Sequence, residues 1–117
     1  MSFGSPASDY IEENLDLNQY LVPHKAATYY LRVSGDAMKN AGIMDGDFLI
    51  VDRSLEVEHN RIIVVEQDGE LLVRRFRNQN NQICLMPENE KYKPVFLRNP
   101  EHLIVWGTVS AVFRKLY

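Results

Sequence analysis

The stretch that decides the fold is SGDAMKNAGIMDGDFLIVD, residues 34–52, in which a polar segment with glycines leads into the apolar run Phe48–Val51. Gly35 and Gly46 are expected in turns whose backbone dihedrals most other residues avoid. An apolar run of this length, bounded by turn residues, is typical of a buried strand. The stretch therefore predicts two turns followed closely by a β-strand.

Further strands are expected on both sides of this stretch. Asp68-Gly69 between two apolar runs is the strongest local signal for a hairpin with a type I′ turn, and residues 78–81 predict a second turn. Prolines at positions 87, 94 and 100 limit the chain near them to edge strands and loops. The remaining strand-length runs are Thr28–Val33, Ile62–Glu66, Leu71–Phe76, Gln82–Met86 and Leu103–Tyr117.

The last of these runs contains Gly107, which predicts a bulge or a bend. In an unbroken strand Trp106 would share one face with Thr108 and Ser110, opposite Phe113. One face would then be buried and the other available to a partner.

The N-terminal residues 1–27 predict an arm with a short helix, ahead of a single β domain at 28–117. Ser8-Asp9 is a candidate N-cap for a helix over Tyr10–Leu15, continuing irregularly to Leu21. The fold class expected is therefore mainly β with a short helical arm.

Composition excludes several classes of protein. The chain has 117 residues and 45% hydrophobic residues, but no run of about 18 apolar residues that could cross a membrane. Its start has neither basic residues nor an apolar stretch, and its single Cys84 cannot form an internal disulfide. A cytoplasmic protein with an inert core thiol is expected. The net charge of −3 argues against direct DNA binding, and Arg74-Arg75-Phe76-Arg77 is expected to be a strand whose alternate residues face solvent.

Neither a metal site nor a cofactor is expected. The three histidines, at positions 24, 59 and 102, are far apart in the sequence, and the chain has a single cysteine. These residues do not have the spacing of metal ligands. The aspartates at 45, 47 and 52 lack the ligand spacing of a calcium loop. Roles in turns and at strand ends are expected for them.

Three segments together resemble the LexA/UmuD family, whose members cut their own chains with a serine–lysine dyad. SGDAM at 34–38 resembles the family's S-G-D-S-M motif, and DGDFLIVD at 45–52 resembles its D-G-D-x-x-x-V-D strand. DGELLVRRF at 68–76 resembles its D-G-E-x-x-V-K-K-x segment. The resemblance implies a LexA/signal-peptidase-like β fold. It places the nucleophile position at Ala37, the general-base position at Arg74 and the surrounding motif turn at Ser34, Gly35, Asp36 and Met38.

Both dyad positions carry residues that cannot do the chemistry. Alanine has no side-chain oxygen with which to attack a carbonyl, and arginine, which stays protonated in proteins, cannot accept a proton near neutral pH. One further departure from the family is His59-Asn60-Arg61-Ile62, which replaces the usual glycine–aspartate before a strand.

The resemblance also implies a function. SPASDY at 5–10 and DLNQ at 16–19 look like the region just after the self-cleavage site of UmuD, so that the chain starts about where processed UmuD′ starts. This implies a non-catalytic, homodimeric accessory subunit of a UmuC-type translesion polymerase, acting in the SOS response at RecA filaments. Two alternatives are a self-cleaving S24 peptidase with an engineered Ala37, and the C-terminal dimerisation domain of a LexA-like repressor.

Overall fold

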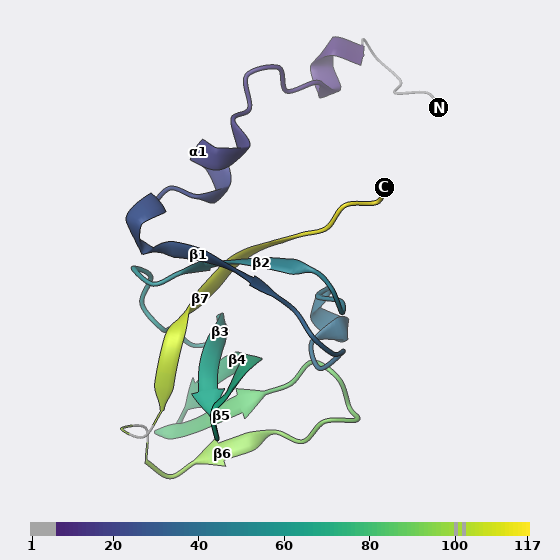
Figure 1. Ribbon diagram of the computed structural model, residues 1–117. Helices are drawn as coiled ribbons and strands as arrows, with labels where there is room; N and C mark the ends of the chain where they lie inside the picture. The colour runs from purple at the N-terminus through teal and green to yellow at the C-terminus, as the bar shows by residue number, and fades with distance from the viewer. Residues whose placement is uncertain (1–6, 100, 102) are drawn as a thin grey trace.

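The computed structural model describes residues 7–99, 101 and 103–117, which form a seven-stranded antiparallel sheet in the order β1-β2-β7-β3-β4-β5-β6 (Figure 1). This confirms the mainly β fold. The expected strand runs are present with small shifts at their ends. The strands are β1 (Thr28–Arg32), β2 (Phe48–Asp52), β3 (Ile62–Gln67), β4 (Glu70–Gln79), β5 (Gln82–Met86), β6 (Val95–Leu97) and β7 (Ile104–Phe113).

The N-terminal arm leaves the sheet and contains one short helix, α1 (Leu17–Leu21), besides 3₁₀ turns at Ala7–Tyr10 and Lys25–Ala27. The helix expected over Tyr10–Leu15 is therefore wrong in position. The reason is Asp16, whose Oδ1 accepts hydrogen bonds from the backbone N–H groups of residues 18 and 19, at 3.0 and 3.3 Å. It acts as the N-cap in place of Ser8 or Asp9. No helix within the described ranges is long and apolar enough to cross a membrane.

Strand β7 joins the two halves of the sheet, because it pairs with both β2 and β3. Its C-terminal half runs beside β2, from Thr108 opposite Asp52 to Phe113 opposite Phe48. Its N-terminal half runs beside β3. In Figure 1 it crosses from the β1–β2 pair to the layer formed by β3, β4, β5 and β6. The single sheet is thus folded about β7.

Two bulges bend β7. The pairing with β3 leaves Trp106 unpaired next to Gly107, which confirms the bulge expected there, and the pairing with β2 leaves Ser110 unpaired. Each extra residue shifts the side chains that follow to the other face. As a result Thr108 is buried, at 2% exposure, while Trp106 is exposed. The expectation that these two residues share a face is therefore wrong.

The core has two parts, one on each face of β3. Val64 contributes to the part formed with residues of the β1–β2 side, namely Met38, Ile43, Leu49 and Val51. Its neighbours Ile63 and Val65 contribute to the part formed with Phe76 and Leu85. A strand that is buried on both faces has to be apolar along its length, which explains the unbroken run in the sequence.

The turns agree with their sequence signals. Asp68 and Gly69 have φ values of 52° and 82°, as the type I′ hairpin between β3 and β4 requires. Asn80 and Asn81, with φ values of 53° and 62°, form the turn between β4 and β5. Between the prolines, β6 is an edge strand as expected, although Pro100 lies outside the described residues. Cys84 is buried in β5, and this burial raises the pKa of its thiol.

We predict that Gly107→Ala lowers the free energy of unfolding by about 2 kcal/mol or more. A Cβ there would lie 2.6 Å from Cγ1 of Val51 and 3.3 Å from the carbonyl oxygen of Asp52. Urea denaturation measures the loss. Gly46→Ala is the control, because its φ is also positive but no atom lies within 4 Å of the added Cβ. Equal losses in the two variants would show that close packing at β7 is not the constraint.

Candidate functional site: a cleft between residues 34–38 and β4

The motif turn at 34–38 follows β1 and is fastened to the turn that precedes β2. Gly35 has a φ of 92°, and its N–H donates a hydrogen bond of 2.7 Å to Oδ1 of Asp45. The N–H of Gly46 donates to the carbonyl of Val33 at 2.8 Å. Met38, at 3% exposure, anchors the end of the motif turn in the core. The glycines and Asp45 therefore serve to shape this turn.

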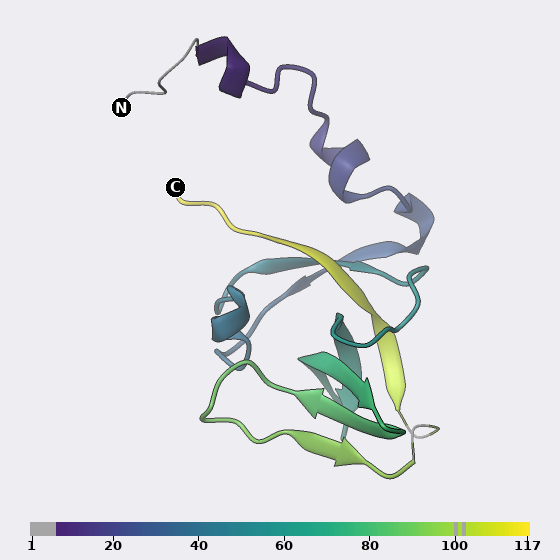
Figure 2. The ribbon, with the colours of Figure 1, turned by 180° about the vertical axis from the view of Figure 1, so that it is seen from behind.

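The loop after β5 holds the motif turn from its other side (Figure 2). The N–H of Glu88 donates to the carbonyl of Ala37 at 2.9 Å, and the carbonyl of Glu88 accepts from the N–H of Asn40 at the same distance. Asn89, almost fully buried, donates from Nδ2 to the carbonyl of Asp36 at 2.9 Å. Position 37 is thus fixed by backbone contacts that do not depend on its own side chain.

Tyr92, from the same loop, links the motif turn to β4. Its hydroxyl donates to Oδ1 of Asp36 at 2.8 Å. This hydrogen bond is the main reason why the pKa of Asp36 is lowered, and it also raises the pKa of Tyr92. The guanidinium carbon of Arg74 lies 5.7 Å from the centroid of the Tyr92 ring, within the range of a cation–π contact.

Ala37 and Arg74 face one cleft of about 250 Å³. Ser34 and Met38 also line it, whereas Gly35 and Asp36 support it from outside. Arg74 is half-buried, and burial lowers the pKa of its guanidinium, which donates a hydrogen bond of 2.8 Å to the carbonyl of Val73. The full lining is Leu31, Arg32, Val33, Ser34, Ala37, Met38, Leu71, Leu72, Val73, Arg74 and Tyr92.

Sequence reasoning missed Tyr92 and Asn89 as parts of this site. Both lie in the stretch interrupted by prolines, where no periodicity assigns a residue to a face. The available signal was local: an aromatic side chain, Tyr92, in a loop between Pro87 and Pro94.

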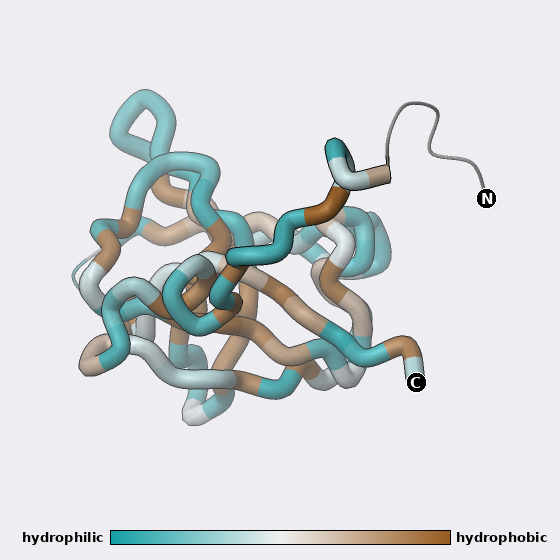
Figure 3. The backbone as a smooth tube through the Cα atoms, turned by 90° about the horizontal axis from the view of Figure 1, so that it is seen from above, coloured by the Kyte–Doolittle hydropathy of each residue, from teal (hydrophilic) through white to brown (hydrophobic). Residues whose placement is uncertain are grey.

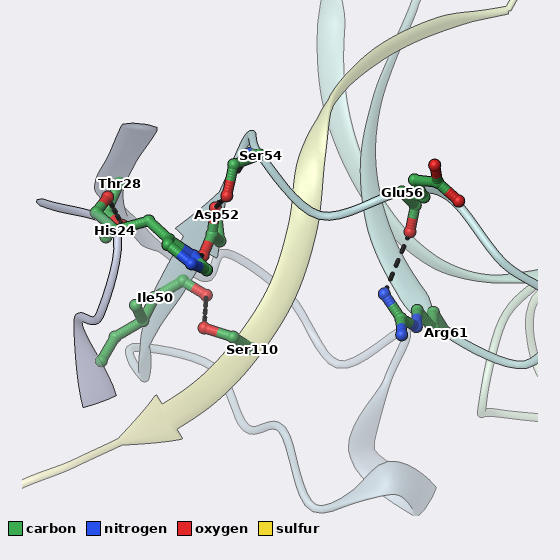
Figure 4. A network of polar contacts seen from close by, with 8 residues as sticks. All are labelled: His24, Thr28, Ile50, Asp52, Ser54, Glu56, Arg61 and Ser110. Atoms are coloured by element: carbon green, nitrogen blue, oxygen red, sulfur yellow. Dashed lines mark hydrogen bonds and ion pairs between the residues drawn. The ribbon is translucent and has the colours of Figure 1, made fainter. Parts of the chain in front are cut away.

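The other candidate residues lie in separate places and have partners of their own. Nδ1 of His24 lies 2.6 Å from Oδ2 of Asp52 (Figure 4). Burial would raise the pKa of Asp52, but hydrogen bonds from Ser54 and His24 outweigh it and lower that pKa. His59 accepts a hydrogen bond from the backbone of residue 78, and Asp47 binds Arg114. His102 lies outside the described residues, and among those that are described no group of His, Cys, Asp or Glu could hold a metal ion.

The folded antiparallel sheet, with positions 37 and 74 facing one cleft, has the plan of a LexA-like peptidase domain. A family model described as Peptidase S24-like matches residues 1–110. The chain belongs to this family.

The chain is similar to proteins of which it covers different shares. Protein SamA of Salmonella typhimurium is 40% identical over 113 residues, which are 97% of this chain and 78% of SamA. Protein MucA of Escherichia coli is 43% identical over 110 residues, 92% of this chain and 74% of MucA. The LexA repressor of Hahella chejuensis is 40% identical over 111 residues, 93% of this chain but 54% of the repressor.

We predict that Tyr92→Phe raises the pKa of Asp36 toward the ordinary value of 3.8, because the variant loses the hydroxyl that stabilises the carboxylate. Carboxyl NMR signals followed through an acid titration measure the change. Tyr20→Phe, in the exposed arm, is the matched control. An unchanged pKa of Asp36 in Tyr92→Phe would contradict the hydrogen bond that links the loop to the motif turn.

Proposed function

We propose that the protein is a non-catalytic, UmuD′-like accessory subunit of an error-prone translesion polymerase in the SOS response. The observation that carries this proposal is the pair Ala37 and Arg74 at the cleft where the family resemblance places a nucleophile and a base. Similarity to the UmuD-like proteins SamA and MucA supports it.

The cleft supports the absence of peptidase chemistry. Acyl transfer needs a hydroxyl at position 37 and a group that accepts its proton. Ala37 supplies no oxygen. Arg74 is a cation at neutral pH in spite of its lowered pKa, and it is already engaged with the Tyr92 ring and a backbone carbonyl.

A function by binding needs exposed surface suited to a partner. An aromatic cluster, defined here as Tyr30 of β1, Phe48 of β2 and Phe113 at the end of β7, lies on one face of these three strands. Phe113 stacks on Phe48 with 5.4 Å between ring centroids and meets Tyr30 edge-on at 6.4 Å. The cluster continues into a groove of about 300 Å³ beside α1, lined mainly by apolar side chains that include Leu17 and Leu21.

We assign the aromatic cluster and this groove to a homodimer, with a second copy of the chain as the occupant. A stable protein interface buries about 1,600 Å² in total, and exposed Tyr30 and Phe113 are the residue types that dominate such interfaces. Figure 3 shows hydrophobic residues, in brown, among hydrophilic ones along the arm, and Leu15 and Leu17 on this arm are exposed. A UmuC-type polymerase and the RecA filament are the further partners that the resemblance implies. The net charge of −3 supports an action on DNA through these partners.

A second candidate, the dimerisation domain of a LexA-like repressor, is favoured by the 40% identity to a LexA repressor. Coding sequence for a DNA-binding domain directly upstream in the gene would favour the repressor domain over the accessory subunit. Codon 37 of the gene would likewise identify an engineered Ala37.

We predict that Ala37→Ser alone cuts no peptide bond, because Arg74 cannot take the serine proton. Ala37→Ser with Arg74→Lys is the informative variant, with a UmuD-like substrate arm supplied on a separate chain and product followed by mass spectrometry. The unmodified protein and the double variant without substrate are the controls. Cleavage by Ala37→Ser alone would disprove the role given to Arg74.

We predict that the chain, expressed with the polymerase of a neighbouring gene, restores ultraviolet-induced mutation to a strain that lacks UmuD and UmuC. Phe113→Asp should abolish the effect and yield monomers by light scattering, since one central interface residue can contribute about 2 kcal/mol, or roughly thirtyfold in affinity. Arg74→Gln should leave mutation nearly unchanged. Soluble protein that fails to rescue with a matched polymerase would favour the repressor domain.

A further inference from the structure

A second pocket, of about 380 Å³, lies where β3, β4 and β7 meet the loop before β3. Arg75 reaches it from β4, where it follows Arg74 directly, so the two side chains project to opposite faces of that strand. Its lining is Leu55, Arg61, Ile62, Arg75, Thr108, Val109 and Ser110. No carboxylate is part of this lining.

Thr108 gives this pocket an unpaired donor. The residue is 2% exposed, and its Oγ1 is the buried side-chain polar atom of the described residues that has no hydrogen-bond partner. Leaving a buried hydroxyl unpaired is unfavourable, so such a group calls for an explanation. The bulge at Trp106 turns Thr108 inward, and Thr108 is one of the residues that line this pocket.

Arg75 is held in place by two hydrogen bonds from its guanidinium group, whose third nitrogen has no partner among the described residues. Nε donates to Oε1 of Glu88 at 2.5 Å, and Nη1 donates to the carbonyl of Asn60 at 2.7 Å. Nη2 donates to no described residue. Asn60, with a φ of 74°, takes up the left-handed conformation that lets its carbonyl receive Arg75.

Arg61 adds the second guanidinium. Nη1 donates to the carbonyl of Glu56 at 3.1 Å (Figure 4), and Nη2 pairs with Glu58 at 3.1 Å. The Glu58 side chain is 54% exposed, and an ion pair so close to solvent is weak. The Ser110 hydroxyl donates a hydrogen bond of 3.3 Å to the carbonyl of Ile50 and is therefore engaged outside the pocket. Arg61, Arg75 and Thr108 are therefore the groups that can donate to a ligand here.

We propose that this pocket binds a small tetrahedral oxyanion, the phosphoryl group of inorganic phosphate or of a phosphomonoester. Nη2 of Arg75 and Nε of Arg61 donate to no described residue and can donate to phosphoryl oxygens, and the Thr108 hydroxyl supplies a further donor. The carboxylates of Glu58 and Glu88 nearby and the net charge of −3 disfavour a long polyanion such as DNA. The site is separate from the cleft and does not depend on the accessory role.

The test is a titration of the full chain with inorganic phosphate at constant pH and ionic strength, followed by amide NMR and by thermal unfolding. We expect saturable shifts around residue 61 and at Thr108, a dissociation constant on the order of 1 mM, and a rise in Tm with phosphate. Glycerol phosphate should bind like phosphate, and a single-stranded oligonucleotide should not bind more tightly.

Variants distinguish binding of phosphate at this pocket from a general attraction of phosphate to positively charged side chains. Arg61→Gln and Thr108→Val should each weaken phosphate binding about tenfold, and Thr108→Ser should retain it. Thr108→Val should also raise the Tm without phosphate, since it removes an unpaired buried hydroxyl. Arg98→Gln removes an equal charge from an exposed position and should change nothing. Shifts that do not saturate, equal weakening by Arg98→Gln and Arg61→Gln, or tighter binding of the oligonucleotide would each overturn the proposal.

Discussion

The close approach of β7 to β2 at Gly107 is the constraint on which the rest of the molecule depends. A side chain at that position would collide with Val51, so the absence of a Cβ lets one strand pair with β2 and then with β3. The motif turn at 34–38 leads toward β2, and Arg74 belongs to β4. The two walls of the cleft are therefore positioned relative to each other through β7 and β3, together with the loop after β5 that holds the motif turn.

The motif turn keeps its shape through contacts that do not use the side chain at position 37. Its contacts run through the backbone of Ala37, the amide of Asn89 and the buried side chain of Met38. None of these contacts uses the side chain at position 37, so alanine there leaves them intact. Arg74 in turn packs on the ring of Tyr92. The folding requirements of this region and the chemical requirements of a dyad are thus satisfied by different atoms.

Local patterns were sufficient to predict the strands, the Asp68-Gly69 hairpin and the bulge near Gly107, because each depends on residues close in sequence. The helix was misplaced since Asp16 competes with Ser8 and Asp9 as a cap, and sequence alone does not rank them. The faces of β7 were misassigned because a rule of alternation cannot count an extra residue in a bulge. Tyr92 and the pocket at Thr108 depend on contacts between distant strands and loops, so local patterns could not place them.

The bulge at Trp106 has an optical consequence. This residue is the chain's one tryptophan. Its ring is partly exposed, and its carbonyl accepts a hydrogen bond of 3.1 Å from the hydroxyl of Tyr29. Indole emission from the whole protein therefore arises at the point where the two halves of the sheet join. A change in its wavelength or quenching would signal movement at this junction, without background from any other indole.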